Sequence, residues 1–472
     1  MTRLRLTLVT LTLAFFGLTA CRRGFEVAAR SPSHMGSEIL ADSRRTPAPQ
    51  ARTTFSSEHA KSADAFVDTI GVNIHLNYLD TVYGSGFSTI ILPMLQRSGI
   101  RHVRDGGAVL DDPQWMRLVY DRANQLATTL GRRIGFTVGM SPMNGTCDMG
   151  HAPVATLLQY LSVANIDAFE GPNERDLNSP CTNTGLSNQW AIEVSTFQRA
   201  LFDTVTASSV TMNIPVVGQS LGAATWSNSA SLIGDQSAFV TFGNQHSYPG
   251  GSYPSKDVTN SLTVLKPVFG TKPQYATETG YHNMTTYDPR LQQGVSERAS
   301  GKYMSRLFFE YFNRGLVRTF SYEFIDETVM PGSEGHYGLL RADGTPKPQF
   351  TVIENTIRLL QDPGANFVPG SLAYSLGTVP DTVHHTLLQK RNGTFYLVLW
   401  QEVSSYQLAT SRTPGADIDV APVNVTLTLE NPAAQVNQYN PLASANPVSS
   451  ISNIQTLALA VPDQALIIEI KQ

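Results

Sequence analysis

The chain has 472 residues, more than one typical domain, and this length favours one large domain together with one small domain. Its apolar fraction of 41% and its charged fraction of 15% are typical of a globular protein with a sizeable core. A net charge of only −4, with no basic stripe along the sequence, argues against a nucleic-acid partner.

The first 21 residues have the pattern of an export signal. Arg3 and Arg5 precede the apolar stretch LTLVTLTLAFFGL, which is too short to span a bilayer comfortably. The stretch is followed by Thr-Ala-Cys and resembles a bacterial lipobox, in which the cysteine, here Cys21, is lipidated; an ordinary signal peptide cleaved after Ala20 is the alternative. We therefore expect an exported lipoprotein, anchored at the outer membrane or the periplasmic face, with residues 22–63 as a flexible tether.

Residues 64–360 alternate short apolar runs with amphipathic stretches. Helical spacing indicates helices that include 115–130, 190–208 and 298–314, and Gly99 marks the end of an earlier one. The apolar runs cover 68–76, 100–107, 133–140, 166–174, 214–221, 242–249, 273–281 and 317–326. Eight such strands separated by helices predict a closed (β/α)8 barrel.

The pattern changes in residues 361–472. The runs HHTLLQK and FYLVLWQ flank an Asn392-Gly393 turn, which is a strong hairpin signal, and residues 423–429 alternate between apolar and polar. These features predict a small antiparallel β-sandwich. The expected fold class is therefore α/β, a TIM barrel followed by a C-terminal β-sandwich domain.

Polar residues stand at the carboxyl ends of the predicted strands, where barrel proteins build their sites. The set consists of His75 on strand one, Arg104 on strand two, Asn173 and Glu174 on strand four, His246 and Tyr248 on strand six, Glu278 on strand seven and Tyr322 on strand eight. One ionisable group at a strand end is unremarkable. A set of them at one rim indicates a shared site.

Glu174 and Glu278 suit the division of roles in glycoside hydrolysis, where one carboxyl donates a proton and the other attacks the sugar. Opposite sides of a barrel mouth can hold two carboxyls about 5 Å apart, the separation of a retaining mechanism. Asn173 could bind the hydroxyl next to the reacting carbon. Arg104 and Tyr248 could keep Glu278 ionised by charge and hydrogen bonding.

The motifs GPNE and ATETG, three strands apart, resemble those of clan A of the glycoside hydrolases and are most similar to family 39. The resemblance covers roughly residues 64–360, and families 30, 39 and 79 also carry a trailing β-sandwich. It implies that Glu174 is the acid/base, Glu278 the nucleophile and Asn173 the ligand of the sugar's 2-hydroxyl.

Further residues match the same pattern. His246 and Tyr248 correspond to the sixth-strand His-x-Tyr, and Arg104 to the second-strand arginine. Many clan members place a tryptophan on the eighth strand beneath the sugar, whereas this chain offers Tyr322 or Phe324. This difference leaves the identity of the sugar open.

The resemblance implies a retaining O-glycoside hydrolase that acts on a poly- or oligosaccharide, with no cofactor and no metal site. A family 79-like β-glucuronidase is one alternative, and the groups available for a sugar carboxylate would be Tyr281, His282, His336 and Tyr337. A catalytically inactive carbohydrate-binding lipoprotein and a transglycosylase are further alternatives.

Several residues allow a structural interpretation as well. Glu278 could form a purely structural ion pair with Arg104, and His75 could be a core histidine rather than a substrate contact. Trp226 could stack on a sugar or cover a helix. Glu323 alternates away from Tyr322 and is expected to face a helix.

Once Cys21 is set aside, Cys147 and Cys181 remain, an even pair that an oxidising compartment would join. They follow the third and fourth predicted strands, whose loops are neighbours in a barrel. We therefore predict a disulfide that stiffens one wall of the site near Glu174, with buried free thiols as the alternative.

Overall fold

Eight parallel strands form a barrel in the computed structural model, which describes residues 54–131, 135–140, 149–177, 189–289 and 292–472. The strands are β3 (Ile70–Asn73), β4 (His102–Gly106), β5 (Gly135–Gly139), β6 (Ile166–Glu170), β7 (Val216–Val217), β8 (Gly243–His246), β9 (Gln274–Thr279) and β10 (Arg318–Ser321). They pair in the order β7-β6-β5-β4-β3-β10-β9-β8, and a parallel bridge between Val217 and Phe242 joins the two ends of this order. The predicted (β/α)8 barrel is confirmed.

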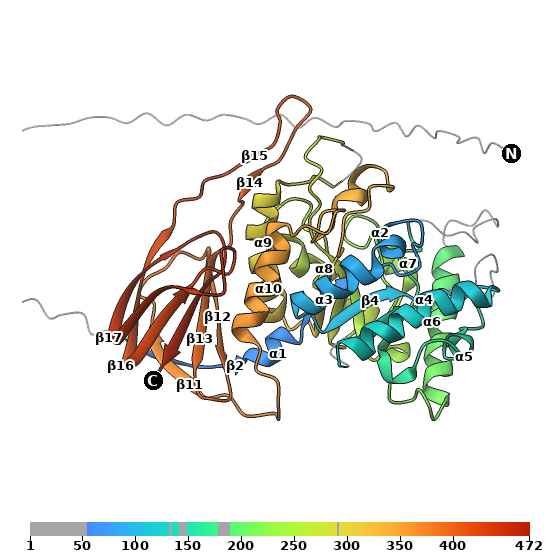
Figure 1. Ribbon diagram of the computed structural model, residues 1–472, viewed down its shortest axis with the longest axis horizontal. Coiled ribbons are helices and arrows are strands. Elements are labelled where there is room, and N and C mark those ends of the chain that lie inside the picture. The colour runs from blue at the N-terminus through green and yellow to red at the C-terminus, as the bar shows by residue number, and fades with distance from the viewer. Residues whose placement is uncertain (1–53, 132–134, 141–148, 178–188, 290–291) are drawn as a thin grey trace, which may run out of the picture. The chain divides into compact units, whose positions relative to one another are not determined.

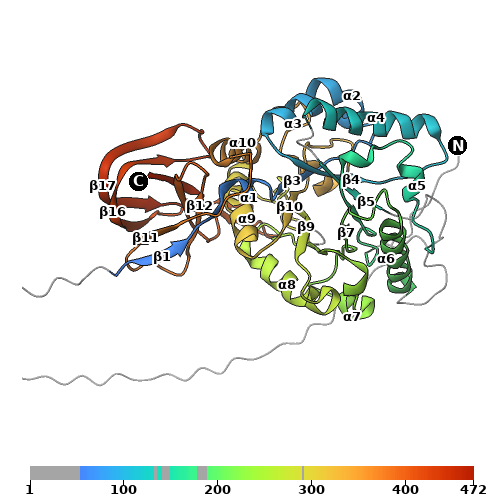
Figure 2. The same cartoon turned by 90° about the horizontal axis from the view of Figure 1, so that it is seen from below.

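Helices surround these strands, with α4, α6 and α8 visible on the outside in Figure 2. The α-helices are α1 (Ala63–Val67), α2 (Val82–Ser85), α3 (Leu92–Ser98), α4 (Pro113–Thr129), α5 (Val154–Leu157), α6 (Gln189–Ala207), α7 (Ser229–Ile233), α8 (Ser255–Phe269), α9 (Glu297–Asn313) and α10 (Pro348–Leu360). Local signals set their ends. Asp112 caps α4 by accepting from the amides of Gln114 and Trp115, and Gly99 ends α3 at a φ of 73° that favours glycine.

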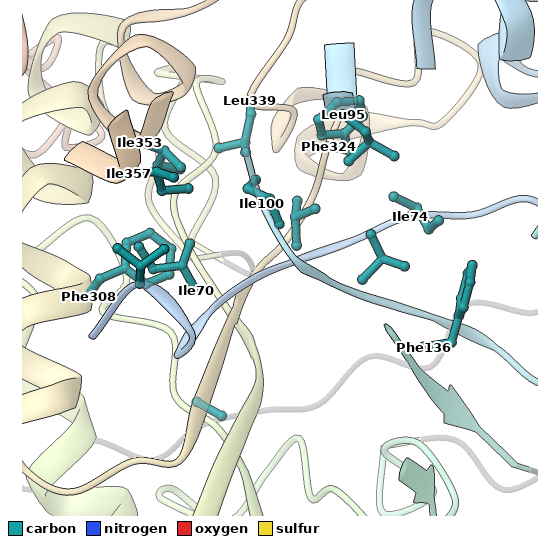
Figure 3. Packing of buried hydrophobic residues seen from close by; sticks show 14 of the residues in the cluster. Ile70, Ile74, Leu95, Ile100, Phe136, Phe308, Phe324, Leu339, Ile353 and Ile357 are labelled. Atoms are coloured by element: carbon teal, nitrogen blue, oxygen red, sulfur yellow. The ribbon is translucent and has the colours of Figure 1, made fainter. Parts of the chain in front are cut away.

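The main hydrophobic core lies between the barrel strands and the helices that cover them. Figure 3 shows part of it, where Ile70 of β3 lies beside Phe308 of α9 and near Ile353 and Ile357 of α10. Residues from strands and helices thus share one packed layer, and this layer fixes the positions of the strand ends.

The second sheet contains eight strands and is mostly antiparallel, in the order β1-β11-β16-β18-β13-β12-β2 with β17 beside β16. Its strands are β1 (Ser56–His59), β2 (Lys61–Ser62), β11 (Ser371–Ser375), β12 (Val383–Gln389), β13 (Phe395–Gln401), β16 (Val423–Tyr439), β17 (Pro447–Val461) and β18 (Leu466–Lys471); β14 (Tyr406–Gln407) and β15 (Ala416–Asp417) form a separate pair. The long strand β16 pairs with β11 at Thr428 and Leu429 and with β18 from Gln435 onward, so it belongs to both halves of the sandwich.

The strands β1 and β2 come from the segment that the sequence predicted to be part of a tether. Ser56–His59 pair with β11, and Lys61 and Ser62 pair with β12. The sandwich is therefore built from both ends of the described chain, and a protein that begins at residue 63 would lack two of its strands.

Helix α9 connects the barrel to the sandwich through buried polar contacts, and Figure 1 shows α9 and α10 next to the sandwich strands. The Arg306 guanidinium donates to the carbonyl oxygen of Val403 at 3.0 Å, and Lys302 donates to Asp463 at 2.9 Å. Glu310 accepts from the Trp400 indole at 2.7 Å. Barrel and sandwich consequently belong to one compact unit that extends from Thr53 to Gln472.

None of the helices within the described ranges is long and apolar enough to cross a bilayer. The predicted signal and the lipidation position Cys21 lie outside the described residues.

A polar cluster lies at the amino ends of the barrel strands, on the side away from the predicted site. His102 of β4 has Nε2 2.9 Å from Oδ1 of Asp68 and Nδ1 2.5 Å from Oδ2 of Asp167. Burial alone would raise the pKa of Asp68. The hydrogen bond from His102 and the charges of His102, Arg318 and Arg101 outweigh burial and lower this pKa to about 2.

This cluster predicts an acid-dependent part of the stability. Because the pKa of Asp68 is lower in the folded state, its contribution is complete above about pH 4 and is lost as the pH falls toward 2. Asp68→Asn should therefore reduce the free energy of unfolding at pH 6, with a difference from wild type that shrinks between pH 4 and pH 3. Urea unfolding at each pH measures this, with exposed Asp203→Asn as the control. A difference that stays constant with pH would contradict the assignment.

Candidate active site

One cavity of about 860 Å³ opens at the carboxyl ends of the barrel strands. The described residues that line it include every predicted site residue of the barrel: His75, Arg104, Asn173, Glu174, Trp226, His246, Tyr248, Glu278 and Tyr322. The barrel thus brings together side chains that are up to 247 residues apart in sequence, His75 and Tyr322 being the extremes (322 − 75).

Arg104, on β4, lies at the bottom of this site with only 8% exposure, and all five of its N–H groups are donated within the protein. Nε and Nη2 donate to the two carboxylate oxygens of Glu170 at 2.7 and 3.0 Å. Nη1 donates to Asn73 at 2.9 Å and to Glu278 at 2.6 Å, and Nη2 also donates to Asn173 at 2.7 Å. Arg104 therefore positions other groups and has no N–H left for a ligand.

Glu278, on β9, is held as a carboxylate. Arg104 donates to its Oε1 and the Tyr248 hydroxyl donates to its Oε2 at 2.8 Å. Burial raises the pKa of Glu278, but the charges of His246 and Arg104 and the hydrogen bonds from Tyr248 and Arg104 lower it more, so the net shift is downward. The structure shows both predicted contacts, and the carboxylate is ionised at neutral pH.

Glu174 is held differently, in the loop after β6. Its backbone has a φ of 45°, in the left-handed region that non-glycine residues rarely adopt, and its amide donates to Ser220 Oγ at 3.2 Å. The side chain places Oε1 2.6 Å from Nδ1 of His246. The backbone of Glu174 thus keeps an unfavourable conformation, and this conformation directs its carboxyl toward His246.

His246 has both ring nitrogens engaged. Nε2 lies 3.0 Å from Thr277 Oγ1, and that hydroxyl is itself 2.9 Å from a carboxylate oxygen of Glu170. The same hydroxyl lies 2.8 Å from Oδ1 of Asn244, so its proton has two acceptors, Glu170 and Asn244. With that proton donated to either acceptor, the Thr277 oxygen accepts from Nε2–H of His246, which leaves Nδ1 to share a proton with Glu174. Burial lowers the pKa of His246, but the charges of Glu278 and Glu174 raise it more, so the net shift is upward.

The two glutamates are close enough to act on one atom. An oxygen of Glu174 and an oxygen of Glu278 lie within 4.8 Å of each other, with His246 between them. One carboxyl is ionised and the other shares a proton, which is the arrangement expected of a base or nucleophile opposite an acid.

Asn173 has its amide orientation fixed by its neighbours. Its Oδ1 accepts from Arg104 at 2.7 Å and from Ser220 Oγ at 3.2 Å. The NH2 group of the amide is therefore the end that can donate to a ligand in the cavity.

Aromatic side chains form much of the cavity wall. The rings of Tyr322 and Tyr337 meet edge to face with centroids 5.4 Å apart, and Trp226 is 72% exposed at the mouth. Tyr322 occupies the eighth-strand position at the cavity, whereas Phe324 is buried in the core. Aromatic rings that line a polar cavity suit contact with the faces of sugar rings.

His75 lines the cavity and also packs within the protein. Its ring stacks on Tyr78 with centroids 4.5 Å apart, and its Nε2 lies 3.2 Å from Oε2 of Glu323. Glu323, expected to face a helix, is buried behind the cavity wall beside His75.

The sequence interpretation missed the buried layer beneath the site. Glu170, Asn244 and Thr277 are all buried and bonded to one another, and Asn73 joins Arg104 to the carbonyl oxygens of Thr277 and Ser321. These residues end or interrupt apolar strand runs, and a buried carboxylate such as Glu170 requires a cation nearby. That requirement is the signal that could have paired it with Arg104.

Two groups of one histidine and two glutamates have ligand atoms within 4.8 Å of each other among the described residues. One is Glu174, His246 and Glu278, and the other is His75, Glu323 and Glu327. Cys147 and Cys181, predicted to form a disulfide, lie outside the described residues.

Solved structures of glycoside hydrolases are similar to this chain. A family 39 glycoside hydrolase from Bacteroides cellulosilyticus WH2 has 12% identity over 87% of this chain and 82% of its own, with a TM-score of 0.57. A glucosidase from Croceicoccus marinus has 10% identity over 88% and 97%, with a TM-score of 0.55. A family 39 β-xylosidase from Caulobacter crescentus has 16% identity over 88% and 98%, with a TM-score of 0.52.

These similarities cover both the barrel and the sandwich, and they establish the fold. The chain has the two-domain fold of the family 39 glycoside hydrolases, as its motifs indicated. No protein-family model matches the sequence, and a search of the curated proteins found no match.

The contacts of Glu170 predict a large effect on stability. Glu170 is fully buried, and Glu170→Gln removes one of the two carboxylates that compensate Arg104 while keeping the side chain's shape. We expect the free energy of unfolding to fall by roughly 3–5 kcal/mol, because the buried Arg104 charge loses the carboxylate that binds it through two hydrogen bonds. Chemical unfolding measures the change, and Glu430→Gln, an exposed position of the sandwich, should stay within about 0.5 kcal/mol of wild type. A loss below about 1 kcal/mol for Glu170→Gln would contradict this role.

Proposed function

We propose that the protein is a retaining glycoside hydrolase. The observation that carries the proposal is the pair of carboxyls within 4.8 Å, one ionised by Arg104 and Tyr248 and the other sharing a proton with His246. This separation suits a retaining mechanism, in which the carboxyls are close together, rather than an inverting one, which needs room for a water. The fold shared with glycoside hydrolases supports the same assignment.

In the proposed first step, an oxygen of Glu278 attacks the anomeric carbon, and the bond from that carbon to the leaving oxygen breaks. Glu174 transfers its proton to the leaving oxygen, so that the aglycone departs as an alcohol. In the second step Glu174, now a carboxylate, takes a proton from water. The water oxygen bonds to the anomeric carbon and the ester to Glu278 breaks, which restores both carboxyls and retains the configuration.

The residues around Glu174 and Glu278 would set the protonation states of these two carboxyls and position the sugar. Arg104 and Tyr248 keep Glu278 ionised, and His246 supports each protonation state of Glu174. The amide NH2 of Asn173 would donate to the hydroxyl adjacent to the reacting carbon, and Tyr322 and Trp226 would contact sugar faces.

The cavity favours a sugar without a carboxylate. Of the groups considered for a glucuronidase, only Tyr337 lines the cavity, since Tyr281 is buried and donates to the Ser252 carbonyl. Glu334 also lines the cavity, and burial, with the charges of Glu278 and Glu174, raises its pKa. The lining also contains Arg175, but its two arginines, Arg104 and Arg175, stand against five acids: Asp105, Glu174, Asp257, Glu278 and Glu334. A uronate would add a further negative charge to this acidic surface, so the β-glucuronidase alternative is disfavoured.

We further propose that the enzyme is an exported lipoprotein anchored through Cys21 and stiffened by a Cys147–Cys181 disulfide, as the sequence pattern favours. The chemistry above does not depend on either feature.

Substrate screening with variants tests the function. Protein that begins at Thr53, which keeps β1 and β2, should cleave a neutral aryl glycoside from a panel that also includes glucuronides. Glu278→Ala should lower kcat by more than about 10³-fold and Glu174→Ala by about 10²–10⁴-fold. Azide should restore turnover of Glu174→Ala on an activated substrate with a product of retained configuration, since it replaces the base-assisted water.

The exposed sandwich variant Glu430→Ala serves as the control and should match wild type. Wild-type protein that binds a glycan without cleaving any substrate would favour the carbohydrate-binding alternative. Unimpaired turnover by Glu278→Ala would refute the assigned nucleophile.

The hydrogen bond from Tyr248 predicts a shift in the pH profile. Tyr248→Phe removes a donor that lowers the pKa of Glu278, so that pKa should rise. The acidic limb of kcat/KM, where Glu278 becomes protonated, should move to higher pH. Tyr322→Phe removes a hydroxyl from the same cavity without a hydrogen bond to Glu278, and it should leave that limb in place. An unchanged limb in Tyr248→Phe would count against control of Glu278 by this hydroxyl.

A further inference from the structure

Four buried polar atoms gather behind the cavity wall that His75 forms. They are Nε2 of His75, the hydroxyl of Tyr83, Oε2 of Glu323 and Oε1 of Glu327. None makes a well-aligned hydrogen bond with the described residues, although Nε2 of His75 and Oε2 of Glu323 face each other 3.2 Å apart. Tyr83, Glu323 and Glu327 are 0%, 1% and 2% exposed. His75 follows β3, Tyr83 belongs to α2, and both glutamates follow β10, so the chain brings these atoms together from three segments.

This arrangement is costly unless something binds there. A buried polar atom without a partner costs about 1–3 kcal/mol, and an unpaired buried carboxylate costs more. Lys347 is the lysine whose charge acts on Glu323, but its ammonium donates to Asp326 at 2.7 Å, to Asn283 at 2.9 Å and to the carbonyl of His336 at 3.4 Å. The two glutamates must therefore either take up protons or share a cation.

The geometry is close to that of a metal site. Nε2 of His75 and Oε2 of Glu323 are 3.2 Å apart, and the ligand atoms of His75, Glu323 and Glu327 all lie within 4.8 Å of one another. Ligands bonded to one tetrahedral zinc ion at about 2.0–2.2 Å are roughly 3.4 Å from each other. Small rotations of two side chains would thus bring all three atoms onto one ion.

We propose that His75, Glu323 and Glu327 bind one divalent metal ion, with zinc as the first candidate. One imidazole and two carboxylates suit zinc, and a fourth position remains for water. The Tyr83 ring meets His75 edge to face with centroids 5.8 Å apart, and its hydroxyl has no hydrogen bond in the described chain. The other cluster, of Glu174, His246 and Glu278, is different because its carboxylates and both nitrogens of His246 already have hydrogen-bond partners.

The ion would fix one wall of the sugar cavity. With Nε2 on the metal, His75 keeps its proton on Nδ1 and is held as a single tautomer. The same ring stacks on Tyr78 and meets Tyr322 edge to face with centroids 5.6 Å apart. The site therefore links the segment after β3 to the segment after β10, and it stands whether or not the proposed hydrolysis is correct.

Zinc binding to the purified full chain tests this proposal after treatment with a chelator. Calorimetric titration with zinc should give one equivalent bound, together with a higher unfolding temperature. Glu327→Gln should weaken zinc binding by at least about 100-fold, since even changes to groups behind metal ligands cost 10–100-fold. Glu334→Gln, a nearby carboxylate outside the cluster, and Glu174→Gln, in the other cluster, should bind zinc like wild type.

Two results would overturn the proposal. One is wild-type protein that takes up no stoichiometric zinc, which would mean that the glutamates are protonated instead. The other is zinc binding that Glu174→Gln abolishes and Glu327→Gln retains, which would put the ion between the catalytic carboxyls. If Glu327→Gln fails to fold, an anomalous difference map from zinc-loaded wild-type crystals decides, because it shows directly whether the ion lies at His75.

Discussion

The arrangement of the site depends on the guanidinium of Arg104. Its five N–H groups reach Asn73 on β3, Glu170 on β6, Asn173 in the following loop and Glu278 on β9, so one planar group joins segments around the barrel mouth. Because it is buried, each of these hydrogen bonds is strong and its loss would leave a charge uncompensated. The ionised state of Glu278 and the orientation of the Asn173 amide both follow from it.

Charge balance explains why Glu174 and Glu278 differ. The centre of the site contains three carboxyls, Glu170, Glu174 and Glu278, and two basic groups, Arg104 and His246. Arg104 is committed to Glu170 and Glu278, which leaves Glu174 to share the proton of His246. Neighbouring carboxyls with different partners can act as acid and nucleophile at one pH, which is the requirement of the proposed mechanism.

Much of the barrel could be predicted because strands such as β3 (IGVN) and β6 (IDAFE) are short, mostly apolar runs that end in a polar residue. The strands β1 and β2 could not be predicted, since the sequence SSEH has no apolar alternation and pairs only through contacts distant in the chain. Glu278 and Glu174 carried motifs, whereas Glu170 did not, because its role depends on a cation 66 residues away. The cluster of His75, Glu323 and Glu327 could not be predicted either, because it forms only when segments distant in the chain come together in the fold.

The central claim is that Glu278 attacks the sugar, and trapping the covalent intermediate tests it most directly. A 2-deoxy-2-fluoro glycoside of the cleaved sugar, with an activated leaving group, should react with the enzyme and accumulate as an ester because the fluorine slows the second step. Mass spectrometry of the digested protein should then find one sugar on the peptide that contains Glu278. A label on another residue, or turnover that gives the inverted anomer with no label, would contradict the account.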